Sequence, residues 1–502
     1  GECVHEHHPA EGRWLQKDDD YVPIELRSGV NRLLIKIDEG SGDFGFVVRL
    51  LNYQETVERI ETNVAVHKEL SVVPEDDGVG AYFGRPYAVS LLNPDPNAQV
   101  TIDLLSGTGQ RLATRSVRPG YAARFPLVDL PEGPLTFRAL FPVGDGKHLT
   151  STIRYYHGTL PRHGVVGLLR DRAMIDTSGQ PWLPIGFYSA PRSAYRKLKQ
   201  AGVNFVVAGG ADLDAAQQAG LKVGVSLHGH GDGWRDHIRE TIKKFHGHPA
   251  LLFWMMVDEP AYNRADLLDI HAAYELIYEL DPVHPSYLVI TRPDGYRTFG
   301  RCCDVLAIDT YPVSRGDYRH VGERMKRAYG LSSGDQPVWH CGQLFAWPSD
   351  RPPTPGEHRY MTYTSLMAGA KGFLWYAYQH AGWTLPDDDP PLWQAHLRLL
   401  AELSDLAPVI VAPGLPEPVD VQGGDDTVHA VVKAGPKRTF LFAANDGRSG
   451  DVSCTLSVPT EGVSEVAVYG ENRTVRAEQG KIRDTFGPLD VHIYRLDPGS
   501  PQ

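Results

Sequence analysis

The sequence predicts a multidomain protein in which a central (β/α)8 TIM barrel is flanked by β-sandwich domains. The chain has 502 residues, enough for roughly three or four domains of ~100–200 residues each. Between about residues 180 and 408, apolar runs alternate with helix-period segments, which is typical of βαβ units around a parallel sheet. On either side, short apolar runs are separated by Pro, Gly, Asn and Asp, which is the pattern of antiparallel sandwiches.

Residues 1–55, the first predicted domain, contain three strand candidates at 21–26, 33–37 and 44–50. They resemble the last strands of a jelly-roll β-sandwich, and three strands alone make an incomplete core. The chain begins Gly1-Glu2-Cys3, with neither an initiator Met nor the apolar stretch of a signal peptide. We therefore expect a partial jelly roll, truncated at its N-terminus, whose missing half lies upstream or which packs against the neighbouring domain instead.

Residues 56–165 and 411–502 are each predicted to form a further β-sandwich. The spacing of turn residues in the first region is that of an immunoglobulin-like domain. Neither region contains a recognisable chemical motif, so we expect both to support the central domain. The strand candidates are 87–92, 100–105 and 135–140 in the first region and 428–432, 439–444 and 491–496 in the second.

Residues 166–410 are predicted to form the barrel, because eight strand candidates follow one another with helical segments between or after them. Eight units over about 230 residues match a (β/α)8 barrel, whose usual size is ~250 residues. A doubly wound sheet is the competing fold, but no strand leads into the Gly-x-Gly-x-x-Gly turn of a dinucleotide site. The strand candidates are 183–188, 205–208, 223–228, 251–258, 286–291, 305–309, 338–343 and 372–378, and the helical segments include 193–201, 235–245, 267–280 and 393–406.

The composition argues against several classes of function. The net charge of −12 gives no support for nucleic-acid binding. No stretch approaches the ~18 apolar residues of a membrane span, so none is predicted. The five cysteines fit neither a disulfide framework nor a zinc site, and nothing indicates a cofactor. Cys302, Cys303 and Cys341 are expected to be buried thiols.

Two adjacent carboxylates end the fourth predicted strand, where residues 251–257 are apolar and Asp258 and Glu259 follow. In a (β/α)8 barrel the active site lies at the carboxyl ends of the strands. Taken alone, such a pair is equally compatible with capping the next helix, because acids favour the first helical turn. The sixth strand ends in a similar way, at Asp309 and Tyr311.

Three other predicted strands also end in polar residues. The third leads to His228 and His230, the seventh contains His340 and Gln343, and the eighth contains Tyr376. Because the strands of a barrel are parallel, all five strand ends converge on one face. His228 and His230 have the chemistry of metal ligands, but their spacing in a Gly-rich loop fits contacts to substrate hydroxyl groups better. No metal site is therefore predicted.

Residues 254–260 read Trp-Met-Met-Val-Asp-Glu-Pro. This segment is similar to the Trp-x-x-x-Asn-Glu-Pro motif of the clan A glycoside hydrolases, with Asp258 in the place of Asn. Residues 368–376, together with the Asp-Glu-Pro and Asp-x-Tyr-Pro patterns, also resemble a mostly uncharacterised group of bacterial glycosidase-like proteins. The resemblance implies a (β/α)8 barrel hydrolase in which Glu259 is the general acid/base.

One position departs from the pattern of that clan. Residues 337–345 resemble the segment that carries the nucleophilic Glu, but Gln343 occupies its place, and an amide cannot form a glycosyl ester. Three alternatives follow. In the first alternative, another carboxylate takes the place of the nucleophilic Glu, with Asp309 the first candidate and Asp258 the second. In the second alternative, the mechanism is inverting or substrate-assisted, and Gln343 positions a water or an acetamido group. In the third alternative, the barrel binds carbohydrate without catalysing its hydrolysis.

A working pair of carboxyl groups in a glycosidase has a characteristic separation. About 5–5.5 Å indicates retention of the anomeric configuration, and about 6.5–9.5 Å leaves room for the water of an inverting enzyme. Glu259 needs its proton near neutral pH to act as the acid. We expect the like charge of Asp258 to help by raising the pKa of Glu259.

Further residues are expected to contact the substrate or to support the site. Tyr376 is placed among the substrate contacts, and His340 either contacts the substrate or packs beneath the site. Glu357 follows Thr354 by three positions, which matches a capping box at the start of a helix. Aromatic side chains in predicted loops offer apolar faces on which sugars stack, and these are Tyr262, Tyr311, Trp347 and Trp383.

The function predicted from the sequence is hydrolysis of a glycosidic bond in an oligo- or polysaccharide, with Glu259 as the proton donor. The rival prediction is a non-catalytic carbohydrate-binding barrel. In either case the partner is a carbohydrate, and no cofactor, metal or nucleic acid is expected. We expect a secreted or periplasmic protein, because sandwich-flanked polysaccharide enzymes usually meet their substrates outside the cytoplasm.

Overall fold

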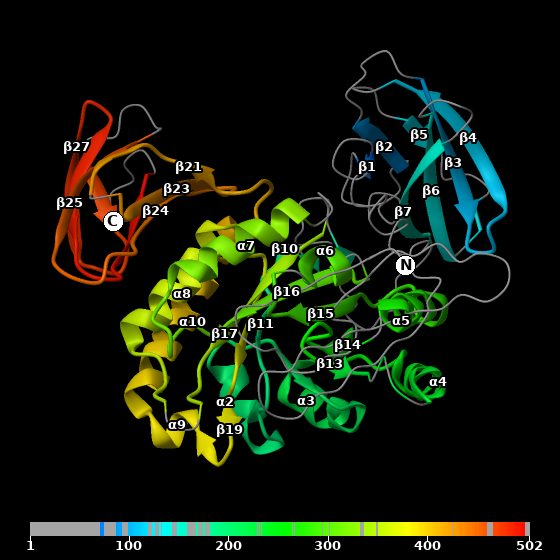
Figure 1. Cartoon of the computed structure of the whole chain (residues 1–502), viewed down its shortest axis with the longest axis horizontal. Helices are drawn as coiled ribbons and strands as arrows, with labels where there is room; N and C mark the ends of the chain where they lie inside the picture. The colour runs from blue at the N-terminus through cyan, green and yellow to red at the C-terminus, as the bar shows by residue number, and fades with distance from the viewer. Residues whose placement is uncertain are drawn as a thin grey trace, which may run out of the picture.

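The computed structural model describes residues 71–74, 87–92, 99–118, 123–125, 130–131, 133–142, 148–157, 167–168, 174–175 and 181–496, the last range apart from 228, 230, 232, 264, 266, 294, 301, 332–335, 348–349, 425 and 459–464. The partial jelly roll predicted for residues 1–55 lies outside them. In the described part of the chain, a barrel lies between two groups of antiparallel strands, one from each side of it in the sequence (Figure 1).

The central domain is a closed barrel of eight strands, each parallel to its neighbours, and β18 pairs with β11 to close it. This confirms the predicted (β/α)8 fold. Each strand overlaps its predicted range, and the differences are confined to the strand ends. The barrel strands are β11 (Ile185–Phe187), β12 (Phe205–Ala208), β13 (Lys222–Ser226), β14 (Leu251–Asp258), β15 (Ser286–Ile290), β16 (Val305–Thr310), β17 (Val338–Gln343) and β18 (Phe373–Tyr376).

Helices between the strands cover the outside of the barrel (Figure 1). The predicted capping box forms at the start of α8, where Thr354 Oγ1 accepts from the Glu357 amide and the Glu357 carboxylate accepts from the Thr354 amide. Within the described residues, no helix is long and apolar enough to cross a membrane. The helices are α2 (Tyr195–Gln200), α3 (Leu213–Ala219), α4 (Trp234–Phe245), α5 (Leu267–Leu280), α6 (Gly295–Phe299), α7 (Arg319–Leu331), α8 (Pro355–Met367), α9 (Leu385–Asp388) and α10 (Pro390–Ile410).

Aromatic side chains fill the interior of the barrel. The ring of Phe253 stacks on Tyr287 with centroids 4.7 Å apart and contacts Phe205 and Trp339 at 5.7 and 5.8 Å. Gly224 makes room for this layer, since a Cβ there would lie 2.2 Å from the Phe253 ring. The barrel is therefore a packed core, as in other barrels of this type, and a site has to form above this layer, at the strand ends.

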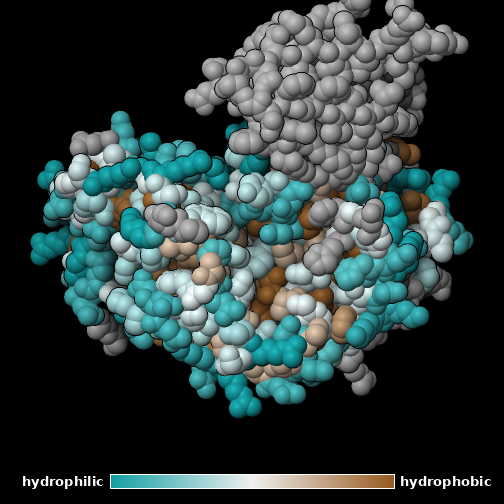
Figure 2. Space-filling view, turned by 60° about the horizontal axis from the view of Figure 1, so that its bottom comes forward, coloured by the Kyte–Doolittle hydropathy of each residue, from teal (hydrophilic) through white to brown (hydrophobic). Residues whose placement is uncertain are grey.

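The carboxyl ends of the strands lie on the lower side of the barrel in Figure 1, where a short hairpin of β19 (Gln379–His380) and β20 (Trp383–Thr384) follows β18. We call these strand ends and the residues that follow them the mouth of the barrel. Figure 2 brings this side forward and shows apolar residues gathered near its centre, surrounded by hydrophilic ones.

Antiparallel strands precede the barrel in two sheets, with the orders β4-β3-β6-β7 and β1-β2-β5. They enclose a core that contains Ile102, Phe125 and Phe137, and the last two rings meet edge to face at 4.9 Å. β2, β3 and β6 contain the three runs predicted as strands. The bounds are β1 (Ser71–Pro74), β2 (Tyr87–Leu92), β3 (Val100–Ser106), β4 (Arg111–Val117), β5 (Ala123–Phe125), β6 (Gly133–Pro142) and β7 (His148–His157).

A small sheet of β8 (Gly167–Leu168), β9 (Met174–Ile175) and β10 (Pro181–Trp182) leads into the barrel. Met174 belongs to the hydrophobic cluster that fills the barrel interior, and Trp182 packs against it. Because β10 ends at Trp182, shortly before β11 begins at Ile185, this sheet covers the amino-terminal end of the barrel. The opposite end, the mouth, is the one left for a ligand.

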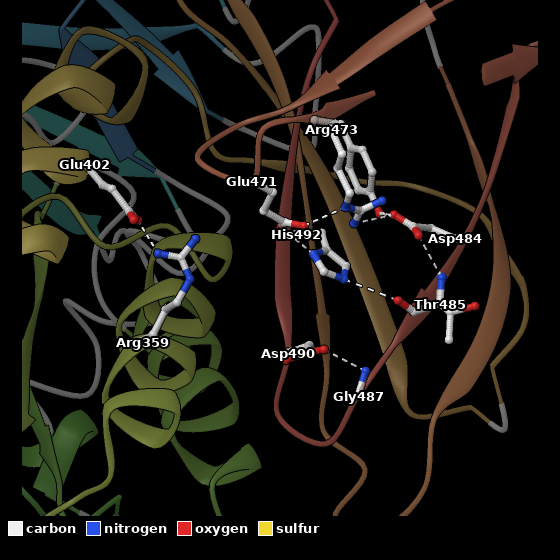
Figure 3. Close-up of polar contacts among 10 residues, drawn as sticks. Arg359, Glu402, Glu471, Arg473, Asp484, Thr485, Gly487, Asp490 and His492 are labelled. Carbon is white, nitrogen blue, oxygen red and sulfur yellow. Dashed lines mark hydrogen bonds and ion pairs between the residues drawn. The ribbon is translucent and has the colours of Figure 1, made fainter. Parts of the chain in front are cut away.

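The segment after α10 forms one antiparallel sheet in the order β21-β23-β24-β29-β26-β27-β28-β25-β22. Polar contacts tie its strands together, and Arg473 pairs with Glu471 and Asp484, each at 2.8 Å (Figure 3). The runs predicted as strands lie in β23, β24 and β29. The bounds are β21 (Glu417–Pro418), β22 (Val421–Gly423), β23 (Val428–Ala434), β24 (Thr439–Asn445), β25 (Val452–Ser457), β26 (Glu465–Val468), β27 (Arg473–Glu478), β28 (Lys481–Phe486) and β29 (Val491–Arg495).

This C-terminal sheet is fixed to the outside of the barrel. The ring of Phe442 on β24 stacks with Tyr363 on α8, with centroids 6.3 Å apart. Lys371 of the barrel and Lys433 of the sheet both donate to the carbonyl of Ala412, at 2.8 and 2.9 Å. The sheet thus supports the helical layer behind β17 and β18.

Candidate active site

Strand β14 brings two acids to the mouth. Its residues are buried from Leu251 to Val257, and Asp258 is the first exposed one. Although the side chain is exposed at the rim, partial burial of its carboxyl group and the charge of Glu259 raise the pKa of Asp258 to about 6. Glu259 is half-buried and has a φ of 41°, a left-handed conformation that costs a non-glycine residue about 1–3 kcal/mol. The surrounding structure therefore holds Glu259 in a strained turn at the mouth.

Asp309 lies inside the barrel, near the end of β16, and only 2% of it is exposed. Burial raises the pKa of Asp309 well above its ordinary value, and a hydrogen bond to Glu259 and the charges of Glu259 and Asp258 raise it further. A hydrogen bond between two carboxyl groups requires a proton on one of them, and the raised pKa of Asp309 favours Asp309 as the donor to Glu259. Its Oδ1 atom has no hydrogen-bond partner among the described residues. The two carboxyl groups are in contact, so they lack the separation of ~5–10 Å between groups that flank a sugar bond.

Gln343 ends β17 and is fully buried, with an exposed fraction of 0%. Its Oε1 accepts from the amide of Val313, and its Nε2 donates to the carbonyl of Phe345, both at 3.2 Å. The side-chain amide therefore joins the loops that follow β16 and β17. The sequence placed Gln343 against the substrate or a water, but the structure uses both ends of the amide for backbone contacts beneath the mouth.

His340 faces away from the mouth, contrary to a direct substrate contact. It is 1% exposed, its ring lies 6.4 Å from that of Phe373, and burial lowers its pKa to about 3. A Cβ on Gly342, two residues along the same face of β17, would meet His340 Nε2 and the ring of Trp375. This face points at the helices because side chains alternate between the two faces of a strand.

Aromatic side chains line one side of the mouth. The ring of Phe345 lies 4.7 Å from Trp347, 4.8 Å from His380, 5.1 Å from Tyr376 and 5.2 Å from Tyr311. Trp347 is 44% exposed at the outer edge of this group. The group therefore presents an apolar wall to a ligand at the mouth, next to the acids.

The structure brings most of the predicted site residues together. Tyr262 is 66% exposed in the turn after Glu259. Trp383 is half-buried and packs against the main hydrophobic cluster of the barrel and helices. His228 and His230 lie outside the described residues. The predicted residues at the mouth are Asp258, Glu259, Tyr262, Asp309, Tyr311, Trp347 and Tyr376. No group of three or more His, Cys, Asp or Glu residues in the described part of the chain is arranged to hold a metal ion.

Two residues at the mouth were missed by the sequence reasoning. His380 Nδ1 is hydrogen-bonded to the hydroxyl of Tyr376 at 3.1 Å, and Ser189, with a φ of 55°, also hydrogen-bonds that hydroxyl. A signal for His380 was available, because Ala381 and Gly382 form a two-residue turn with φ values of 48° and 86°, and a residue pair ending in Gly favours such hairpins. Ser189 had no local signal.

The fold and the site together define a (β/α)8 barrel protein with acidic and aromatic side chains at the carboxyl ends of its strands. No family model and no curated protein matches the sequence. The structure is similar to a solved family 39 glycoside hydrolase from Bacteroides cellulosilyticus WH2, with 12% identity and a TM-score of 0.42 over 80% of this chain and 95% of that chain.

Two further solved structures have the same kind of similarity. An α-amylase from Geobacillus thermoleovorans has 9% identity and a TM-score of 0.46 over 63% of this chain and 98% of that chain. A β-D-glucuronidase from Dictyoglomus thermophilum has 14% identity and a TM-score of 0.35 over 62% of each chain. At these identities and TM-scores the similarities assign neither a substrate nor a catalytic residue to this chain.

Proposed function

We propose that this protein hydrolyses a glycosidic bond in an oligo- or polysaccharide, with Glu259 as the general acid/base. The observation that carries the proposal is the cluster of three carboxyl groups, Asp258, Glu259 and Asp309, at the mouth of a closed barrel. Burial and like charge keep protons on such groups near neutral pH. A proton held in this way is what the oxygen of a departing sugar requires.

Glu259 is the member of the cluster best placed to transfer the proton. It is half-buried, whereas Asp309 is almost fully buried and reaches it by a hydrogen bond. A hydrogen bond between two carboxyl groups requires a proton on one of them, so this contact holds a proton beside Glu259. Glu259 passes this proton to the glycosidic oxygen, and Asp309 holds Glu259 in position.

The aromatic residues at the mouth suit a carbohydrate ligand. Trp347 and Tyr262 keep 44% and 66% of their surface exposed, so their rings are accessible to a ligand. Their faces match the apolar C–H faces of sugar rings. Acids beside exposed aromatic rings are thus arranged both to bind a saccharide and to protonate it.

The proposal is tested by measuring turnover of a panel of aryl glycosides and oligosaccharides by the wild-type chain and by Glu259→Gln. The matched control is Glu240→Gln, on the exposed face of α4. We expect Glu259→Gln to lower kcat by about 100-fold or more while the affinity for the saccharide is retained, and the control to behave as wild type. Saccharide binding without turnover by the wild-type chain would instead establish the carbohydrate-binding barrel.

A further inference from the structure

We propose that Tyr376, acting together with His380, is the second catalytic group of the site and activates the attacking water opposite Glu259. This inference rests on the proposed function, because a hydrolase needs a group on each side of the bond. Gln343 is buried against backbone, and Asp309 is in contact with Glu259. Neither is therefore placed to act from the opposite side.

Tyr376 stands at the level of the barrel where the clan A nucleophile is expected. In the pairing of β17 with β18, it lies directly beside Gln343. Unlike Gln343 it is only half-buried. Burial raises the pKa of Tyr376, and the charges of Asp258 and Glu259 add to this effect, so the hydroxyl and the acids face the same space at the mouth.

His380 is held in place to receive a proton from this hydroxyl. Its Nδ1 lies 3.1 Å from the Tyr376 oxygen, and in the tautomer with the proton on Nε2 the hydroxyl donates to Nδ1. The imidazole ring is packed against Phe345 at 4.8 Å and Trp347 at 5.7 Å. It also sits on a hairpin strand, paired with Trp383, so the position of the acceptor is fixed before a ligand arrives.

Ser189 supplies a second contact to the Tyr376 oxygen. The hydrogen bond from the Ser189 hydroxyl favours negative charge on that oxygen and works to lower the pKa of Tyr376 against the stronger effect of burial. Ser189 follows β11, which ends at Phe187, and has a φ of 55°, a conformation that a serine keeps only when its surroundings enforce it. Strain held at a residue that touches a polar group at the mouth is characteristic of a functional position.

The reaction balances with these groups. The water oxygen attacks the anomeric carbon, the bond from that carbon to the leaving oxygen breaks, and the leaving oxygen takes the proton of Glu259. The water gives a proton to the Tyr376 oxygen while Tyr376 passes its own proton to Nδ1 of His380. Tyr376 is thus a neutral phenol before and after the step, and its raised pKa is no obstacle. His380 then releases its proton to solvent, Glu259 regains one, and the anomeric configuration is inverted.

The test uses the full chain and a saccharide that the wild type cleaves, with the variants Tyr376→Phe, His380→Gln and the double variant. Tyr274→Phe and His429→Gln are the controls, because they also remove a tyrosine hydroxyl contact, to Asp304, and a histidine–acid contact, to Asp446, away from the mouth. We expect each mouth variant to lower kcat by about 100-fold or more with KM changed by less than about threefold. The double variant should be no slower than the slower single one, because the two residues act as a unit.

Two further readouts separate this role from a structural one. In His380→Gln the acid-side limb of the pH profile of kcat/KM should disappear, and proton NMR of the first wild-type product should show the inverted anomer. Retention of configuration, a raised KM with unchanged kcat, or Tyr376→Phe within about twofold of wild type while Glu259→Gln is inactive overturns the inference and leaves the proposed function standing. If no glycoside is cleaved by the wild type, both the proposed function and the role of Tyr376 and His380 are wrong. Thermal unfolding identifies a misfolded variant, and His380→Asn then replaces His380→Gln.

Discussion

The carboxyl group of Asp309 is hydrogen-bonded to that of Glu259. The two residues come from β16 and from the end of β14, which are separated by β15 in the barrel, so the contact reaches over one intervening strand. Since burial raises the pKa of Asp309, Asp309 is the donor in this hydrogen bond, and we assign it a positioning role. The sequence had offered Asp309 as the second carboxylate across the sugar bond, a role for which the two groups are too close.

This contact predicts different outcomes for two substitutions of Asp309. Asp309→Asn keeps a donor for Glu259 and adds no charge, so kcat should stay within about tenfold of wild type. Asp309→Ala leaves Glu259 without this partner and should lower the free energy of unfolding by about 1–3 kcal/mol and kcat further still. Denaturant unfolding and steady-state kinetics check both. Equal effects of Asn and Ala on kcat would show that the donated hydrogen bond is unimportant.

Asp258 predicts a pH-dependent change in stability. Its pKa is raised to about 6 in the folded protein, so its ionisation opposes folding: the penalty is absent below the ordinary Asp value of ~3.9, grows between the two values and is fully present above about pH 6. Asp258→Asn removes this ionisation and should raise Tm at pH 7.5 by roughly 2 °C and leave Tm unchanged at pH 3.5. Thermal unfolding at the two pH values is the measurement. A lower Tm at pH 7.5 would contradict the sign.

The two backbone contacts of the Gln343 amide predict that substitution of this residue lowers stability. A carboxylate at this position keeps an acceptor for the Val313 amide but loses the donor to the Phe345 carbonyl. Gln343→Glu should therefore lower the free energy of unfolding by about 1–3 kcal/mol, because it buries an unpaired charge or carbonyl. Chemical denaturation at pH 7 measures this. If Gln343→Glu were as stable as wild type and gained turnover with retention, Gln343 would instead be a disabled nucleophile.

The exposed aromatic ring of Trp347 predicts a binding effect without a folding effect. Trp347→Ala should raise KM for an oligosaccharide by about two- to tenfold, equivalent to the 0.5–1.5 kcal/mol typical of one aromatic contact, with Tm close to wild type. Leu415→Ala is the matched control, because Leu415 is 42% exposed and Trp347 44%, but Leu415 lies in the segment after α10. A similar KM for both variants would remove Trp347 from the binding surface.

Substitution of Glu357 should change the pH dependence of stability in the opposite sense to substitution of Asp258. Burial works to raise its pKa, but hydrogen bonds from Arg351 at 2.6 and 2.7 Å and from Tyr318 outweigh this and lower the pKa to about 2. The stability gained is present above the ordinary Glu value and is lost as the pH falls toward 2. Glu357→Gln should thus be about 1–2 kcal/mol less stable at pH 7.

Unfolding of Glu357→Gln at pH 7 and near pH 2 checks this prediction, and Glu323→Gln on the exposed surface of α7 is the control. The difference from wild type should vanish near pH 2. A difference that is the same at both pH values would mean that the charge of Glu357 contributes nothing, and that only the shape of the side chain matters.

The barrel and the positions of its strand ends were predictable because their signals are local. An apolar run bounded by polar residues and followed by a helical period marks a strand of a parallel sheet wherever it falls in the chain. The motif of Asp258 and Glu259 stands at such an end, and the two residues of the capping box, Thr354 and Glu357, are only three positions apart. Each of these features depends on neighbours in the sequence.

The sequence by itself thus determined the closed barrel, the acids at its mouth and the departure at Gln343. Only the tertiary structure decided the direction of each side chain and the residues that it contacts. The strand that holds His340 and Gln343 is buried on both faces, so its composition has no polar–apolar alternation to show which face meets the helices. The contacts of Glu259 with Asp309 and of Gln343 with Val313 join residues 50 and 30 positions apart, and they form only because barrel closure brings distant strand ends within hydrogen-bonding distance.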